Sequence, residues 1–199
     1  MGRCMRVVAI CVVVLACAET GFAAVTMEPL CIRIYDTAGT SPDDRRRAMK
    51  RATEILADAD VEVDWRDCSP WPAPRHPSCS ESPKPGELVV RLVRQPESRH
   101  LRALGEALVD TATRTGVLAT VFVDRIEQFA ARARADVESM LGRVVAHEIG
   151  HLLLGTPDHA QTGLMREIWS AKDPARKHGD DWLFSRADIE RIRQFRRTS

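Results

Sequence analysis

The sequence lacks a large excess of charge of either sign, since 29 Lys and Arg residues face 28 Asp and Glu residues along 199 positions. It has no polybasic tract of the kind that binds nucleic acid and no acidic tail typical of disorder. It also has no internal repeat, and Tyr35 is its only tyrosine. The length suits one globular domain, and we expect no nucleic-acid partner.

A membrane-spanning apolar run is also missing. The run Val7–Ala18 has about 12 residues, whereas a spanning helix needs roughly 20. Two arginines precede this run, and small residues follow it at Gly21 and Ala23. This order predicts a signal peptide over residues 1–23 and a secreted or periplasmic mature protein, residues 24–199, that forms a single domain. An uncleaved anchor and lipoprotein cleavage at Cys17 are the alternatives.

Cysteine pairs with the CxxC spacing of structural zinc sites are absent after residue 23. Three cysteines remain there, Cys31, Cys68 and Cys79, and export permits a disulfide. Cys68 and Cys79 flank a proline-rich loop and form the expected pair, which leaves Cys31 as the odd cysteine, on a strand. A Cys31–Cys68 pair is the competing connectivity, and the sequence does not choose between them.

The periodicity of apolar residues predicts both strands and helices. Alternation or short apolar runs predict strands over 30–35, 61–65, 87–93 and 117–123. Helical periodicity predicts a helix from Ser41 to about Asp58, a long helical stretch over 126–154 with a break near Ala135, and a C-terminal helix from Ser185 to about Arg196. Residues 105–116 look like a loop or short ribbon, and residues 156–181 look like a loop. The order favours an α+β or mixed α/β fold, in which one mixed sheet is covered by two main helices.

The residues with the clearest chemistry lie late in the long helical stretch. His147 and His151 are four residues apart, so on a helix both imidazoles share one face and can bind one metal ion. Glu148 would lie beside that ion, where its carboxylate can take a proton from bound water whose pKa zinc has lowered. The alternative is an exposed helix with two incidental histidines, but burial of Glu148 without a charge partner would be costly.

A catalytic zinc ion needs a third protein ligand and one open position. His159 is the best candidate, because Gly155 can turn the chain sharply after the helix and Pro157 stiffens its return. Asp158 is the alternative ligand; otherwise it is a loop carboxylate that accepts backbone hydrogen bonds. Three other histidines lie in polar stretches and are expected at the surface without a role: His76, His100 and His178.

These residues resemble the metzincin clan of zinc peptidases, of which matrixins are familiar members. The clan's pattern is HExxHxxGxxH followed by a methionine in a tight turn beneath the metal. Residues 147–151 match this pattern directly, whereas Gly155 comes one residue late and His159 two residues late. Met165 matches the methionine and lies 14 residues after His151, as in matrixins. The whole chain is also similar to small exported bacterial proteins that carry this motif.

The resemblance implies a zincin-like fold with a mixed twisted sheet, one catalytic Zn²⁺ ion and a peptide or protein substrate. It implies metal ligands at His147, His151 and His159 and a general base at Glu148. It also implies that residues 117–123 form the edge strand along which an extended peptide binds. The sequence departs from the clan where Arg166 and Glu167 follow the methionine, since many relatives have a tyrosine shortly after it.

The sequence is compatible with three functions. The first is a metalloendopeptidase that acts on extracellular or periplasmic proteins. The second is an exported zinc-binding protein without peptidase activity, which the irregular ligand spacing keeps open and Glu148 argues against. The third is a hydrolase of another amide, such as a cell-wall peptide.

Overall fold

The computed structural model describes residues 28–70, 76–94, 103–167, 169–170, 172 and 179–198. The expected signal peptide and Cys17 lie outside the described residues, as do His100 and His178. In the part that is described, no helix has the length and apolar character needed to cross a membrane.

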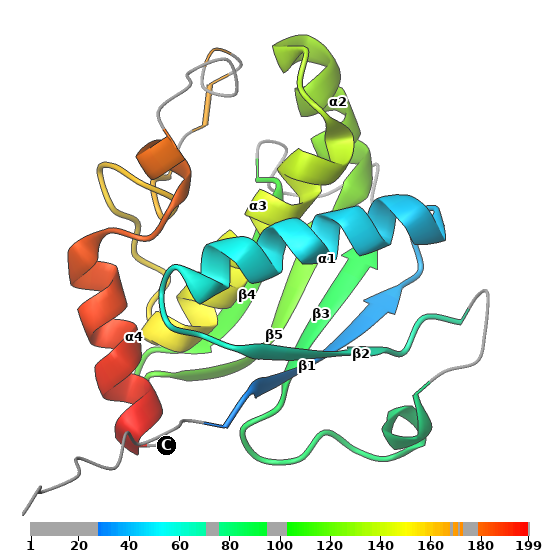
Figure 1. Ribbon diagram of the computed structural model, residues 1–199. Coiled ribbons are helices and arrows are strands. Elements are labelled where there is room, and N and C mark those ends of the chain that lie inside the picture. Colours follow the sequence, from blue (N-terminus) through cyan, green and yellow to red (C-terminus); the bar gives the residue numbers. More distant parts are fainter. Residues whose placement is uncertain are drawn as a thin grey trace, which may run out of the picture.

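The described chain forms one mixed sheet with helices, shown in Figure 1. The elements follow in the order β1 (Leu30–Asp36), α1 (Pro42–Ala57), β2 (Val63–Asp67), η1 (Pro77–Ser80), β3 (Leu88–Val93), β4 (Gly105–Asp110), β5 (Thr115–Phe122), α2 (Val123–Ala133), α3 (Val137–Leu154), η3 (Gly179–Trp182) and α4 (Arg186–Thr198). The strand order across the sheet is β2-β1-β3-β5-β4. Neighbouring strands are parallel except β4, which runs antiparallel to β5 at one edge.

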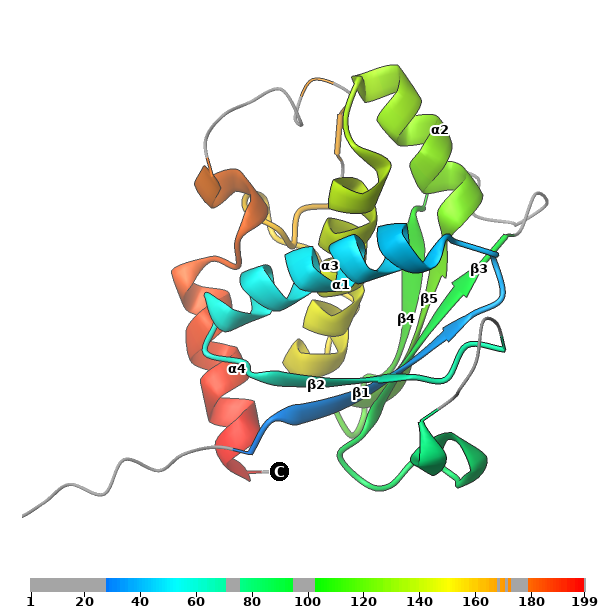
Figure 2. The same ribbon diagram turned by 45° about the vertical axis from the view of Figure 1, so that its right-hand side comes forward.

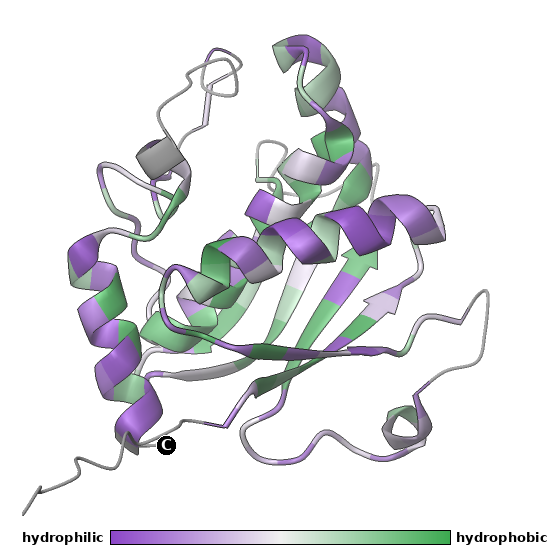
Figure 3. Ribbon diagram, viewed as in Figure 1, coloured by the Kyte–Doolittle hydropathy of each residue, from purple (hydrophilic) through white to green (hydrophobic). Residues whose placement is uncertain are grey.

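Helices α1 and α3 lie together on one face of the sheet, as Figures 1 and 2 show from two sides. The strand residues below them pair in register, as Ile32 does with Leu88 and Leu92 with Val121, and all four side chains are buried. Figure 3 shows hydrophobic residues gathered on these strands and hydrophilic residues along the outer surfaces of α1 and α4. The core therefore lies between the sheet and these two helices.

The main helices match the predictions from the sequence. Ser41 caps α1 by accepting a hydrogen bond from the Asp44 backbone N–H. Apolar residues at helical spacing face the core and are fully buried: Ala48, Ala52, Ile55 and Leu56. The predicted break near Ala135 separates α2 from α3, and Arg134 takes a left-handed conformation there. The predicted C-terminal helix is present, and the Asp188 backbone N–H donates to the Ser185 hydroxyl at its start.

Of the two predictions about this region of the sheet, one is confirmed in one of its two forms and the other is wrong. Residues 105–116 form the short ribbon and not the loop, because Gly105–Asp110 form strand β4, and β4 joins β5 through a hairpin. As a consequence β5, which holds most of residues 117–123, is not the edge strand; β4 occupies the edge in the described sheet. The second strand begins at Val63, two residues later than predicted.

The opposite face of the sheet carries a buried ionic cluster beneath the proline-rich loop. Arg33 is fully buried and its guanidinium contacts the Glu87 carboxylate at 2.6 Å, while its Nη1 donates to the backbone oxygens of Ser78 and Glu81. Arg66 also donates to Glu87, at 2.8 Å. The cluster therefore ties the loop to β1 from below.

The loop is also closed covalently. Cys68 and Cys79 form a disulfide with a Cα–Cα distance of 5.4 Å, as predicted, and Cys31 is a free thiol on β1. The competing Cys31–Cys68 pair is not formed. A disulfide and a buried ionic cluster thus hold the same loop, so reduction alone leaves the loop attached to the sheet.

Replacement of Glu87 should destabilise the fold strongly. The change Glu87→Ala leaves the buried Arg33 without its carboxylate, and breaking a buried pair in this way costs about 3–5 kcal/mol. Urea unfolding measures the loss. The control is Glu127→Ala, which removes an exposed pair with Arg94 and should cost below about 1 kcal/mol. Equal effects of the two changes would show that the cluster does not hold the loop.

Candidate active site

Helix α3 places the HExxH residues in the interior, next to the edge of the sheet. His147, Glu148 and His151 are 7%, 5% and 5% exposed, so the motif is not on an exposed helix face. The apolar residues around it are also buried: Val144, Val145, Ile149, Leu152 and Leu153. The alternative of two incidental surface histidines is therefore excluded by their burial.

Backbone carbonyls fix the orientation of both histidines. His147 Nδ1 lies 2.8 Å from the Leu164 backbone oxygen, and His151 Nδ1 lies 2.9 Å from the Thr156 backbone oxygen. A carbonyl oxygen only accepts, so both Nδ1 atoms must carry hydrogen. Each neutral ring then has its lone pair on Nε2, which is the atom left to bind a metal ion.

The two Nε2 atoms lie 3.1 Å apart. In the neutral rings this brings two lone pairs together with no hydrogen between them, an arrangement that a shared cation would satisfy. Ligand distances of about 2.0–2.1 Å in tetrahedral zinc sites correspond to nitrogen separations of about 3.3 Å. The donor chemistry and the spacing therefore fit a metal ion bound to His147 and His151.

His159 completes the group from the loop after α3. One ligand atom from each of His147, His151 and His159 lies within 4.8 Å of the others, and His159 is exposed. Its ring lies 4.7 Å from that of His151, centroid to centroid. Two buried ligands and one exposed ligand leave the site reachable from solvent.

Burial controls the protonation of this group in the metal-free chain. Desolvation, followed by the charge of His151, lowers the pKa of His147 to about 3. Desolvation also lowers the pKa of His151. Both rings are therefore neutral at neutral pH, which is the form that binds a metal ion.

Glu148 lies against the edge strand. A Cβ atom on Gly105 of β4 would lie 2.6 Å from Glu148 Oε1, so the strand approaches the carboxylate as closely as only a glycine allows. Desolvation, followed by the charge of Glu106, raises the pKa of Glu148 to about 8. A nearby dication favours the ionised carboxylate, so metal binding would return Glu148 towards its basic form.

The predicted methionine turn lies directly below the helix. A Cβ on Gly150 would meet Met165 Sδ at 2.6 Å, so the absence of a side chain there permits the turn to pack against the helix. Met165 is 1% exposed, and Gly163 enters the turn with φ +75°. The turn also supplies the Leu164 oxygen that orients His147.

Asp158, the alternative third ligand, forms a hydrogen bond within its own loop instead. Asp158 Oδ2 accepts a hydrogen bond from the Thr156 hydroxyl, and Asp158 is not a member of the metal-binding group. Trp169, which the sequence did not single out, places its ring 5.4 Å from that of His147. No periodic pattern marks this tryptophan, because it lies in an irregular segment after the turn.

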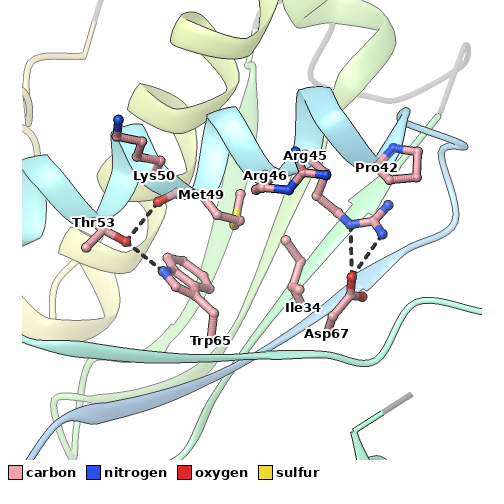
Figure 4. A pocket seen from close by; sticks show the side chains of 9 residues that line it. All are labelled: Ile34, Pro42, Arg45, Arg46, Met49, Lys50, Thr53, Trp65 and Asp67. Atoms are coloured by element: carbon pink, nitrogen blue, oxygen red, sulfur yellow. Dashed lines mark hydrogen bonds and ion pairs between the residues drawn. The ribbon is translucent and has the colours of Figure 1, made fainter. Parts of the chain in front are cut away.

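A cavity of about 470 Å³ lies elsewhere, between α1 and β2, as Figure 4 shows. Its lining includes Trp65, Met49 and an ion pair between Arg45 and Asp67, and it contains no histidine. Strand β2 is at the sheet edge opposite β4, so this cavity is separate from the histidine group.

Two solved structures share this architecture. A zinc-dependent peptidase from Methanocorpusculum labreanum superposes with a TM-score of 0.52 at 14% identity, over 81% of this chain and 99% of that one. The archaemetzincin of Methanopyrus kandleri gives 0.50 at 18% identity, over 84% and 95%. The chain has a zincin-like fold. No family model and no curated protein matches the sequence.

The zincin-like fold confirms the predicted fold class, with a five-stranded mixed sheet, two main helices below it and a C-terminal helix. Within that fold, one helix and the loop after it bring His147, His151 and His159 together as a group positioned to hold a metal ion. Glu148 and the edge strand β4 adjoin this group.

Proposed function

We propose that the protein is a zinc-dependent peptidase of the metzincin type. The observation that carries the proposal is the position of three histidines around one point, with two Nε2 lone pairs 3.1 Å apart and Glu148 next in sequence. The zincin-like fold, shared with two zinc peptidases, supports it. His147, His151 and His159 would hold the ion.

A bound zinc ion would supply a Lewis acid that acidifies water and polarises a carbonyl. Glu148 accepts the proton of the attacking water and then delivers it to the leaving amine nitrogen, as a general base and general acid in turn. The burial of Glu148 raises its pKa to about 8, which makes the ionised carboxylate a stronger base for the proton of the water. A pKa near neutrality also lets the protonated form pass that proton on to the leaving amine.

Strand β4 is the proposed binding surface for the peptide. It is the edge of the described sheet, so its outer backbone groups can pair with an extended chain. Gly105 brings this strand against Glu148, which would place a paired peptide beside the general base. We further propose that the substrate is an extracellular or periplasmic protein, on the strength of the amino-terminal sequence.

Removal of the metal ion should abolish hydrolysis reversibly. Dialysis of the mature chain against a chelator should reduce cleavage of labelled casein to background, and one equivalent of Zn²⁺ should restore it. Because the ion binds the folded chain, zinc should also raise the thermal midpoint.

Two outcomes distinguish the alternatives. Stoichiometric zinc binding without hydrolysis of casein or of cell-wall peptides would favour a zinc-binding protein without activity. Hydrolysis of cell-wall peptides alone would identify a different amide as substrate. A chain that neither binds zinc nor gains stability from it would refute the proposed site.

A further inference from the structure

Beside the histidine group lies a cluster of two tryptophans and two arginines. Trp182 is 2% exposed, and the Arg143 and Arg166 guanidinium carbons lie 4.1 and 4.8 Å from the centroid of its ring. The Trp169 ring packs perpendicular to the same ring at a centroid distance of 5.0 Å, and Trp169 also contacts His147. The cluster therefore adjoins the proposed metal site directly.

Helix α3 fixes this proximity. Arg143 and His147 are four residues apart on the helix, so they lie on one face, about one turn from each other. Arg143 is half-buried. A peptide whose scissile bond lies at the histidines would therefore place a neighbouring residue near Arg143.

The cluster contains hydrogen-bond donors without acceptors. The buried Arg143 Nε, Trp169 Nε1 and Trp182 Nε1 atoms have no hydrogen-bond partner in the part of the chain that the structure describes. Arg143 Nη1 contacts only a weak acceptor, Met140 Sδ, at 3.4 Å. Since more than about 90% of buried polar groups in proteins are partnered, three unpartnered donors in one cluster require an explanation.

The charges around Arg143 also indicate that an anion is missing from the cluster. No carboxylate among the described residues forms an ion pair with Arg143. The charges of Arg51 and Arg166 act on it unfavourably, and the more distant charge of Asp136 acts on it favourably. Burial and these two arginines lower its pKa to about 10, so it stays charged at neutral pH. Charges that are partly withdrawn from water are ordinarily paired, and this one has no ion-pair partner among the described residues.

We propose that Arg143, with the indole N–H groups of Trp169 and Trp182, binds a carboxylate of the peptide substrate close to the scissile bond. The inference rests on the proposed peptidase function and adds a substrate class to it. A guanidinium that contacts an indole through its face keeps N–H groups in its own plane, which suits a carboxylate. In a peptide this group is an Asp or Glu side chain or the C-terminal carboxylate.

The test uses the zinc-loaded chain and paired fluorogenic peptides. The members of each pair differ only by Glu against Gln at one position, which is moved along both sides of the cleaved bond. A further pair differs by a free or amidated C-terminus and separates the two carboxylate sources. A charge-assisted hydrogen bond predicts a ratio of kcat/KM of roughly 10- to 100-fold in favour of the carboxylate at one position.

Variants assign that preference to the cluster. Arg143→Gln should reduce the carboxylate-to-amide ratio to near one, whereas Arg143→Lys should retain part of it because it keeps the charge. The matched control is Arg132→Gln, on the exposed part of α2, which should leave the ratio unchanged. Near-ultraviolet circular dichroism, which reports the packing of the tryptophans, checks that each variant is folded.

The outcomes separate this inference from the peptidase function. Hydrolysis with a ratio near one at every position would overturn the carboxylate site and leave the peptidase function intact. If no peptide is cleaved, the peptidase proposal fails, and calorimetric binding of the same pairs to the wild type decides the inference. Equal affinities would then refute it, and a preference for the carboxylate that Arg143→Gln removes would support it.

Discussion

Replacement of Glu148 by glutamine should abolish hydrolysis while zinc stays bound. Glutamine has nearly the same shape but cannot accept the proton of the attacking water. The loss of a general base predicts a fall in kcat/KM of roughly 10²- to 10⁴-fold. Zinc content should remain one ion per chain, because the proposed ligands are the three histidines and the carboxylate lies beside them.

The matched control is Glu138→Gln, in the first turn of the same helix, where the carboxylate forms a partly exposed pair with Arg47. This change should leave both zinc content and hydrolysis close to those of the wild type, because such pairs contribute below about 1 kcal/mol. Full activity of Glu148→Gln would remove the general-base role. Loss of zinc from it would show that the carboxylate is itself a ligand.

The change His159→Ala should weaken zinc binding severely, whereas Asp158→Ala should not. His159 belongs to the histidine group, and Asp158 accepts a hydrogen bond from Thr156 instead. Loss of an outer-sphere partner already costs about 10- to 100-fold in metal affinity, so loss of a direct ligand should exceed roughly 100-fold. Competition with a chromophoric chelator measures both affinities.

The two adjacent positions make this comparison strict, since both variants alter the same loop by one side chain. If Asp158→Ala releases zinc and His159→Ala retains it, the ligand assignment must be reversed. Equal and small losses would mean that the ion is held by His147 and His151 with a ligand from outside the loop.

Local sequence patterns predict the helices and most strands because their causes are local. Ser41 caps α1 through its own hydroxyl, and the buried alanines of that helix recur at helical spacing. The sequence predicts strand β4 less clearly, as part of a loop or short ribbon. Glu106 and Asp110 face solvent, and the segment is a strand because it pairs with β5. The position of the edge follows from that pairing, so it could not be deduced from one strand alone.

Some features of the candidate active site could likewise be predicted from the sequence, and others could not. The positions of His147, Glu148 and His151 on one helix follow from their spacing, and Gly155 predicts the turn that leads to His159. The backbone oxygens of Thr156 and Leu164, which orient the two rings, carry no signal in the sequence because every residue has one. The contact of Arg143 with Trp182 joins residues far apart in the chain and depends on the path of the loop between them.

The open edge at β4 also bears on how copies of this protein avoid one another. A strand edge that can pair with a peptide can equally pair with the same edge of a second molecule, which is a route to aggregation. Here the edge has six residues, and its pairing with β5 shifts between Leu108 and Val109. Its exposed side chains are the acidic Glu106 and Asp110 with Leu108 between them. Two such edges placed side by side would bring like charges together, and the register shift would interrupt their pairing. Pairing between two copies of the chain through β4 is therefore disfavoured, while the strand stays accessible to a peptide.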